Sequence, residues 1–297
     1  MMKSLFDRFR VLCVVLVVGA AIHSPATANE PEVLNLYDEG SIPGHVPEGP
    51  ERDTTKPDGR TVAGERVMRL GGVSNPQLHI FEPEQPAAST VIILPGGGFH
   101  ILAWDLEGTE IGQWLRSRGV RAAVLKYRTP TADQSVKYRS PVLDAHRAVE
   151  LVRQRYPQSA VGLLGFSAGG HTVAQTVFHH GDPEDLPSGN ASDVDFVTLV
   201  YPAYLVENSR STSLVPSLRV RQDSPPTFLA HAADDRLTSN GSTMLHAELI
   251  RQGISSELHV FATGGHGFGG RRSGDPTDVW RSLCEKWMRT AGWMPAK

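Results

Sequence analysis

Residues 161–173 read VGLLGFSAGGHTV, and this stretch decides the fold. An apolar run with the character of a strand leads into Gly165-Phe-Ser-Ala-Gly169, and a stretch with helical periodicity follows it. This is the G-x-S-x-G pattern of a nucleophile elbow, a sharp strand-to-helix turn that lifts a serine hydroxyl clear of a sheet. Glycines flank the serine because side chains there would collide with the neighbouring strand and helix. The pattern in this setting indicates that Ser167 is a nucleophile.

Short apolar runs alternate with longer helical patterns on both sides of this elbow. We expect strands at residues 65–70, 77–81, 90–94, 120–127, 161–166, 196–201, 227–231 and 257–261. We expect helices at residues 107–118, 141–156, 168–180, 241–252 and 277–290. The first two strands are predicted to form an antiparallel pair. The alternation of the remainder predicts an α/β fold, with a mainly parallel sheet and helices on both of its faces.

A serine nucleophile needs a base, which in this kind of fold comes late in the chain, after an acid. His266 lies in Gly264-Gly-His-Gly-Phe-Gly269, directly after the last apolar strand, where a loop could carry an imidazole over the elbow. His171 is expected to pack beside the site, and His231 and His259 to lie in the core. His266 is therefore the predicted base.

The acid is expected in the loop after the strand at residues 227–231. Asp234 and Asp235 are adjacent there, and spacing alone does not choose between them. Either could accept a hydrogen bond from the imidazole and fix its tautomer. Asp193 and Asp195 are rivals, but they precede their strand and so belong at the opposite end of the sheet.

A glycine-rich loop, Pro95-Gly-Gly-Gly-Phe-His100, follows the strand at residues 90–94. Consecutive glycines let backbone N–H groups approach an oxyanion, so we expect the N–H groups of Gly97, Gly98 and Ala168 to form an oxyanion hole. A phosphate-binding loop is the alternative. Neither of the patterns typical of such loops, G-x-x-x-x-G-K-[ST] and G-x-G-x-x-G, follows the strand. Asp105 and Glu107 could suggest a glycosidase pair. Their spacing at a helix start instead favours N-capping and a favourable interaction with the helix dipole.

Composition excludes several other classes of function. The chain has 297 residues, of which 40% are apolar and 21% charged, as in an ordinary globular protein. Its net charge of −3 gives no electrostatic reason to expect nucleic acid as a partner. It has two cysteines, Cys13 and Cys284, and no histidines or cysteines at the spacing of metal ligands. We therefore expect no metal and no other cofactor.

The first 28 residues have the pattern of a secretory signal peptide. A basic start with Lys3, Arg8 and Arg10 precedes an apolar run at residues 11–21, and Ala26-Thr-Ala28 supplies a cleavage site. The run is too short to span a bilayer, so no stable membrane anchor is expected after its removal. We expect a periplasmic or secreted protein, with an extended lead-in at residues 29–64 and one catalytic domain at residues 65–297.

Taken together, these motifs resemble the acetyl esterase/acetylxylan esterase-like branch of the α/β-hydrolases, an exported bacterial esterase/lipase group. The motifs that carry the likeness are LPGGGF from residue 94, DLEG from 105, LKYR from 125, GFSAGG from 165, PPTFLAHAADD from 225 and GGHGFG from 264. In that family the acid lies four residues past the strand-end histidine, which implies Asp235. Leu237-Thr238 departs from a valine-proline frequent in relatives.

The resemblance implies a serine carboxylic ester hydrolase that removes short acyl groups, with acetyl expected, from a small-molecule or polysaccharide ester. A peptidase of the prolyl-oligopeptidase type is an alternative, but the roughly sixty residues before the first strand cannot make the propeller of that family. A hydrolase fold kept only for binding is a second alternative, against which the intact set of site residues argues. The sequence does not specify the acyl or alcohol group.

Overall fold

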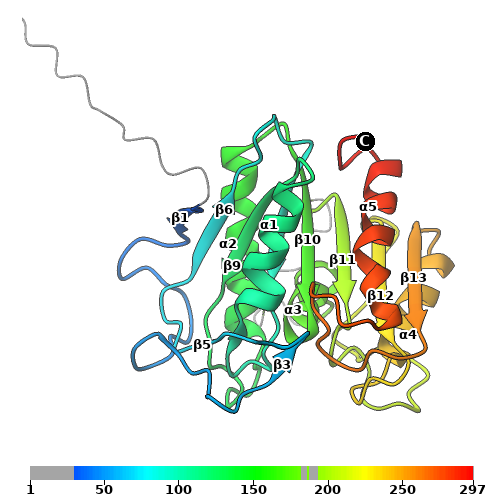
Figure 1. Cartoon of the computed structure of the whole chain (residues 1–297), viewed down its shortest axis with the longest axis horizontal. Coiled ribbons are helices and arrows are strands. Elements are labelled where there is room, and N and C mark those ends of the chain that lie inside the picture. Colours follow the sequence, from blue (N-terminus) through cyan, green and yellow to red (C-terminus); the bar gives the residue numbers. More distant parts are fainter. Residues whose placement is uncertain (1–29, 182–185, 187–192, 297) are drawn as a thin grey trace, which may run out of the picture. The chain divides into compact units, whose positions relative to one another are not determined.

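A computed structural model of the chain describes residues 30–181, 186 and 193–296 (Figure 1). The predicted signal peptide, residues 1–28, lies outside the described residues. Residues Pro31–Lys297 form one compact unit built on an eight-stranded sheet. In sheet order its strands are β1 (Glu32–Asn35), β6 (Gln77–Phe81), β9 (Arg121–Lys126), β7 (Ser89–Leu94), β10 (Ala160–Phe166), β11 (Phe196–Val200), β12 (Thr227–Ala232) and β13 (Ser256–Phe261).

The sheet is mainly parallel, as predicted. The six strands from β9 to β13 in sheet order run parallel, and only β6 and the edge strand β1 are antiparallel to their neighbours. The carboxyl ends of the parallel strands therefore meet at one edge of the sheet. Ligands of open α/β sheets bind outside that edge.

Helices cover both faces of the sheet (Figure 1). One face carries α1 (Glu110–Arg116) and α5 (Trp280–Thr290), and the other carries α2 (Arg139–Arg155), α3 (Ser167–Phe178) and α4 (Asn240–Arg251). Because successive side chains of a strand point to opposite faces, β7 contributes side chains to the hydrophobic core on each face of the sheet. Ile92 and Leu94 join the core under α2, α3 and α4, while Val91 and Ile93 join the core under α1 and α5.

Two small sheets lie outside the main one. One contains β2 (Arg52–Asp53), β5 (Arg69–Gly71) and β8 (Leu102–Ala103), and the other contains β3 (Thr61–Val62) and β4 (Glu65–Arg66). The predicted antiparallel pair of residues 65–70 with 77–81 is therefore wrong. The edge of β6 that a hairpin partner would need is occupied by β1, which comes from the lead-in.

Two predicted helices begin differently from their sequence pattern. Residues 107–118 form a π-helical turn at Asp105–Thr109 that continues into α1. Residues 277–290 form a 3₁₀ turn at Pro276–Val279 that continues into α5.

A buried ion pair attaches the lead-in to the main body of the fold. The side chains of Arg128 and Asp144 have no exposed surface and lie 2.7 Å apart. The Arg128 guanidinium also donates to the carbonyl oxygens of Pro43 and His45. The lead-in is thus held both by backbone pairing through β1 and by this guanidinium.

Candidate active site

Ser167 lies at the sharp turn between β10 and α3, at the carboxyl end of a central strand. Its φ of +49° is in the left-handed region, which non-glycine residues seldom adopt. The turn is also tightly packed. A Cβ at Gly165 would lie 2.6 Å from the carbonyl oxygen of Gly169, and one at Gly169 would overlap the carbonyl oxygens of Leu94 and Pro95. The two glycines of the elbow motif are therefore required by close backbone approach.

The structure brings Ser167, His266 and Asp235 together in a hydrogen-bonded chain. The Ser167 Oγ lies 2.7 Å from Nε2 of His266, and Nδ1 of His266 lies 2.7 Å from Oδ2 of Asp235. Three separate segments meet here: the β10–α3 turn, the loop after β12 and the loop after β13. The arrangement lets the hydroxyl give its proton to Nε2 while Nδ1–H donates to the carboxylate.

Asp235 is held by more than the imidazole of His266. Its Oδ1 accepts the backbone N–H of Leu237 at 2.7 Å, and its Oδ2 lies 2.9 Å from Nε2 of His231. Burial on its own raises the pKa of Asp235. The hydrogen bonds from His231, His266 and Leu237 outweigh burial, so the pKa lies well below its ordinary value. Asp235 is therefore a carboxylate throughout the neutral range.

The other candidate acids take different positions. Asp234 accepts the backbone N–H of Gly265 at 2.8 Å, which ties down the loop that carries His266. Asp195 lies just before β11, where it pairs with Arg153 at 2.7 Å and accepts the N–H of Val161. Asp193 also precedes β11. The geometry at the serine therefore selects Asp235 from the candidates that spacing left open.

Arg60, a residue of the lead-in, binds the backbone of the loop that carries His266. Its Nη2 donates to the carbonyl oxygens of His266 at 2.6 Å and Gly267 at 3.0 Å. Both acceptors lie more than 200 residues away in the sequence. Sequence analysis did not identify Arg60, since one arginine in an aperiodic segment gives no signal of this contact.

The glycine-rich loop after β7 has the shape that its composition predicts. Gly97 and Gly98 have φ values of +139° and +66°, which a side chain would strain. Among the described residues, the hydrogen bonds outside helices and strands leave the N–H groups of Gly97 and Gly98 without an acceptor. Ala168 lies in the first turn of α3, where N–H groups have no partner within the helix. These are the three N–H groups that the predicted oxyanion hole would use.

The predicted capping roles of Asp105 and Glu107 are wrong. The turn begins at Trp104 without a side-chain cap, and Asp105 instead accepts the N–H of Met68 and pairs with Arg271. Glu107 is buried, with Oε2 accepting the N–H of Gly96 at 2.7 Å and Oε1 accepting the Tyr201 hydroxyl at 2.9 Å. Burial raises the pKa of Glu107, against the effect of these two donors.

The position of Glu107 could have been found from helical spacing. Ile111 and Leu115 follow it at intervals of four residues, and both lie in the core under α1. A carboxylate in register with such a buried face must find hydrogen-bond donors inside the protein. Here the donors are the glycine-rich loop and Tyr201, whose ring also contacts that of His266 at 5.1 Å between centroids.

His171 packs beside the site as expected. It lies one turn after Ser167 on α3, is nearly fully buried, and its ring contacts the rings of Phe99, Tyr138 and Tyr204. Within the described residues no three His, Cys, Asp or Glu side chains are placed to hold a metal ion.

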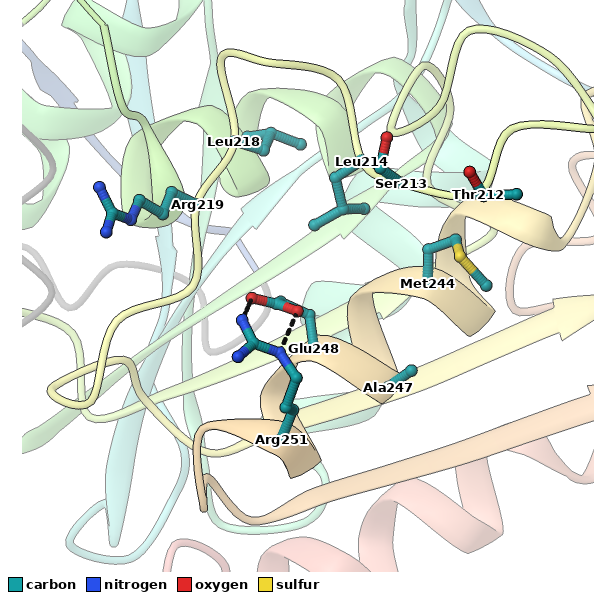
Figure 2. Close-up of a pocket in the computed structure, with 9 residues that line it drawn as sticks. All are labelled: Thr212, Ser213, Leu214, Leu218, Arg219, Met244, Ala247, Glu248 and Arg251. Atoms are coloured by element: carbon teal, nitrogen blue, oxygen red, sulfur yellow. Dashed lines mark hydrogen bonds and ion pairs between the residues drawn. The ribbon is translucent and has the colours of Figure 1, made fainter.

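A separate hollow of about 330 Å³ lies between α4 and the loop at residues 212–219 (Figure 2). Leu214 and Leu218 face Met244 and Ala247 across it, and Glu248 and Arg251 pair with each other at one side (Figure 2). No histidine lines it to activate the hydroxyl of Thr212 or Ser213, and it includes none of the site residues, so the candidate active site remains the one at Ser167.

Comparison with known proteins identifies the fold family. No family model matches the chain. An acetylxylan esterase of Xylanibacter ruminicola is 27% identical over 232 residues, 68% of this chain and 46% of the relative, so the chain spans less than half of that relative's length. An acetyl ester-xyloside bifunctional hydrolase from Caldicellulosiruptor lactoaceticus superposes with a TM-score of 0.65 at 26% identity, over 90% of this chain and 98% of its own.

An alpha/beta hydrolase enzyme from a Medee basin deep-sea metagenome library gives a TM-score of 0.60 at 24% identity, over 73% of this chain and 92% of its own. The chain has the α/β-hydrolase fold and is similar to acetyl esterases. The predicted fold class is thus confirmed, and so is the family likeness that the sequence motifs indicate.

Proposed function

We propose that this α/β-hydrolase is a serine carboxylic ester hydrolase that removes short acyl groups, acetyl above all, from a polysaccharide or a small-molecule ester. The hydrogen-bonded chain from Ser167 through His266 to Asp235 carries the proposal. Its support is the position of that chain at the carboxyl edge of the sheet, beside a glycine-rich loop in which the N–H groups of Gly97 and Gly98 have no acceptor among residues 30–181 and 193–296.

In the proposed reaction Ser167 Oγ attacks the ester carbonyl carbon while His266 Nε2 accepts the hydroxyl proton. The N–H groups of Gly97, Gly98 and Ala168 hold the oxyanion of the tetrahedral intermediate. His266 then protonates the departing alcohol, which leaves an acyl-serine. A water molecule, deprotonated by His266, attacks that ester and releases the carboxylic acid. Asp235 fixes the tautomer of His266 and stabilises the imidazolium that forms twice in the cycle.

The acyl group and its carrier are proposed from the relatives. One is named as an acetylxylan esterase and another as an acetyl ester-xyloside hydrolase, and both names contain an acetyl ester and a xylose-based carrier. Glycosidic cleavage is not proposed for this chain. Glu107 is buried with both oxygens engaged, and Asp105 pairs with Arg271.

The proposal is tested with the wild-type protein and its Ser167→Ala variant. The substrates are acetylated xylan, 4-nitrophenyl acetate and a prolyl peptide anilide. We expect acetate release from the two esters, little cleavage of the anilide, and loss of at least three orders of magnitude of ester hydrolysis in the variant, as removal of a triad member generally causes. Stoichiometric labelling of Ser167 by a fluorophosphonate is expected as well.

Each alternative function has its own outcome. Faster cleavage of the anilide than of the esters would favour the peptidase. A wild-type protein that hydrolyses none of the three substrates and takes no fluorophosphonate label would leave a binding function. Retention of more than about a tenth of the activity in Ser167→Ala would remove this serine as nucleophile.

We further propose that residues 1–28 are a signal peptide and that the enzyme works in the periplasm or outside the cell. No helix of the described residues is long and apolar enough to cross a membrane. The proposal predicts a mature chain that starts at Asn29, with the lead-in at residues 29–64 followed by the catalytic domain at residues 65–297. N-terminal sequencing of protein secreted from its host, or from a heterologous bacterium, decides the cleavage point.

A further inference from the structure

A second histidine contacts the acid of the proposed triad. His231 lies on β12, four residues before Asp235, and its side chain has no exposed surface. Its Nε2 lies 2.9 Å from Oδ2 of Asp235, and its Nδ1 lies 2.9 Å from the hydroxyl of Ser242 in the first turn of α4. Both ring nitrogens of this buried imidazole are thus occupied.

The two histidines share one carboxylate oxygen. Oδ2 of Asp235 accepts from His266 Nδ1 at 2.7 Å and from His231 Nε2 at 2.9 Å, while Oδ1 accepts the Leu237 N–H at 2.7 Å. Three hydrogen-bond donors therefore fix the orientation of the Asp235 carboxylate. Only one of them, His266, belongs to the reacting groups.

The tautomer of a neutral His231 follows from its two contacts. A carboxylate only accepts hydrogen bonds, so the proton of neutral His231 must be on Nε2. Its Nδ1 is then an acceptor, and the hydroxyl of Ser242 is the donor to it. Ser242 has no exposed surface, so no solvent competes for this bond. The residues are linked in the order Ser242, His231, Asp235, His266 and Ser167.

We propose that His231 is a positioning residue of the hydrolase, which holds the Asp235 carboxylate in the orientation that His266 requires. The role rests on the proposed ester hydrolysis at Ser167. His231 is fully buried behind the acid and does not contact substrate. Its removal is therefore expected to lower kcat and leave KM unchanged.

Two substitutions separate this role from ordinary packing. The amide nitrogen of a glutamine can occupy the place of Nε2, so His231→Gln keeps a donor to Asp235. The shorter asparagine reaches only the place of Nδ1, so His231→Asn keeps the contact with Ser242 and loses the donor to Asp235. The two variants are alike in polarity, and each keeps one of the two hydrogen bonds of His231 and loses the other.

The assay is hydrolysis of 4-nitrophenyl acetate, with kcat normalised to the serine labelled by a fluorophosphonate. We expect His231→Asn to lose about 10- to 100-fold in kcat, the usual effect of losing a partner that orients an active-site group. His231→Gln is expected to stay within about threefold of the wild type. Equal kcat values in the two variants, whether both reduced or both normal, would overturn the proposal, because they would show that only the packing of His231 matters.

A second readout does not depend on ester hydrolysis. The pH at which His266 titrates can be followed by NMR of its imidazole in each variant. Besides Asp235, the titratable groups near this ring include Glu107, Tyr201, Arg60, Asp234 and His231 itself. The first four are unchanged by the substitutions, and both variants lack His231, so its own charge cannot account for a difference between them.

Loss of the His231 donor leaves more negative charge on Oδ2 for the imidazolium. We therefore expect the His266 titration to move to higher pH in His231→Asn and to stay in place in His231→Gln. The same titration in both variants and the wild type would contradict the proposal. If the wild-type protein hydrolyses no ester, the proposed function fails, and this titration still decides whether His231 controls Asp235.

Discussion

The hydroxyl of Tyr201 donates a hydrogen bond of 2.9 Å to the buried carboxylate of Glu107. The other oxygen of Glu107 accepts the N–H of Gly96, and the Tyr201 oxygen accepts the N–H of Gly269 at 2.9 Å. Gly96 begins the glycine-rich loop and Gly269 ends the loop of His266. The pair therefore connects the proposed oxyanion hole to the proposed base through the interior of the protein.

We predict that Glu107 and Tyr201 act as one unit in hydrolysis. Glu107→Gln replaces an acceptor oxygen with a donor, and Tyr201→Phe removes the hydroxyl, so each variant breaks the connection. Each is expected to lower kcat by about tenfold or more. The kcat of the double variant is expected to be little lower than that of the less active single variant, because substitutions within one hydrogen-bond network have non-additive effects. Steady-state kinetics on 4-nitrophenyl acetate checks this. Additive losses would show that the two side chains act separately.

We predict that substitutions at the two adjacent aspartates differ strongly in effect. Asp235→Asn presents an amide where His266 needs an acceptor, which favours the wrong tautomer and is expected to cost about 10⁴ in kcat. Asp234→Asn keeps an oxygen for the N–H of Gly265 and is expected to stay within about threefold. The measurement is kcat at saturating ester for both variants. Similar small losses at the two positions would mean that Asp235 is not the acid.

We predict that Cys284 reports global unfolding. A chain that starts at Asn29 contains no other cysteine, and Cys284 lies fully buried in the core on α5. Burial raises the pKa of its thiol to about 12. The reactive thiolate is therefore nearly absent at pH 8 and would form only as the pH approaches 12.

A thiol reagent such as Ellman's reagent is expected to react very slowly with the native protein at pH 8. In urea the reaction is expected at once, at the rate of a free thiol. Rapid labelling of protein that still hydrolyses ester would show that α5 opens locally without global unfolding.

We predict that breaking the buried Arg128–Asp144 pair destabilises the fold. Asp144→Asn leaves the guanidinium buried without its counter-charge, which generally costs about 3–5 kcal/mol. Urea unfolding followed by circular dichroism gives the free energy of unfolding. Glu248→Gln is the control, because it breaks a surface pair with Arg251 and is expected to change little. Equal unfolding midpoints for the two variants would be evidence against the prediction.

We predict that short acyl esters are hydrolysed much faster than long ones. The segment between α3 and β11, residues 180–195, is rich in Asp, Pro, Ser and Gly and has few of the bulky apolar residues of a lipase lid. A long chain then has little surface to bury, and each unburied CH₂ forfeits roughly 0.8 kcal/mol of binding. Comparison of kcat/KM for acetyl, butyryl and decanoyl esters of one alcohol tests it. A decanoyl ester as good as the acetyl ester would reveal an acyl channel.

Most of the sheet and the serine, histidine and aspartate cluster could be predicted from sequence because their signals are local. The elbow motif fixes Ser167 through the close approach of Gly165 and Gly169, which only glycine permits. His266 and Asp235 follow the ends of two apolar strands, and the carboxyl ends of parallel strands gather at one edge. Local pattern and overall topology agree at these positions.

The contacts that support this cluster were not predicted, because the sequence around a residue does not show which partner its side chain meets. Glu107 was interpreted as a residue of a helix start, although its donors come from Gly96 and Tyr201. His231 has the sequence environment of a core residue, and only the turn after β12 reveals its bond to Asp235. The pairing of β6 with β1 was missed for the same reason, since the lead-in carries no periodic pattern.

The contacts of the lead-in limit how far the enzyme can be trimmed. A shortened chain that began at residue 65 would lose the β1 edge strand, the two carbonyl oxygens that solvate the Arg128 guanidinium, and the Arg60 side chain on the loop of His266. The first loss exposes the edge of β6, and the second leaves the buried Arg128 guanidinium with fewer hydrogen-bond acceptors. The third removes a contact that holds the loop of the proposed base. A fusion partner or affinity tag therefore belongs ahead of Glu32, and an evolving gene could recombine at that point without dismantling the site.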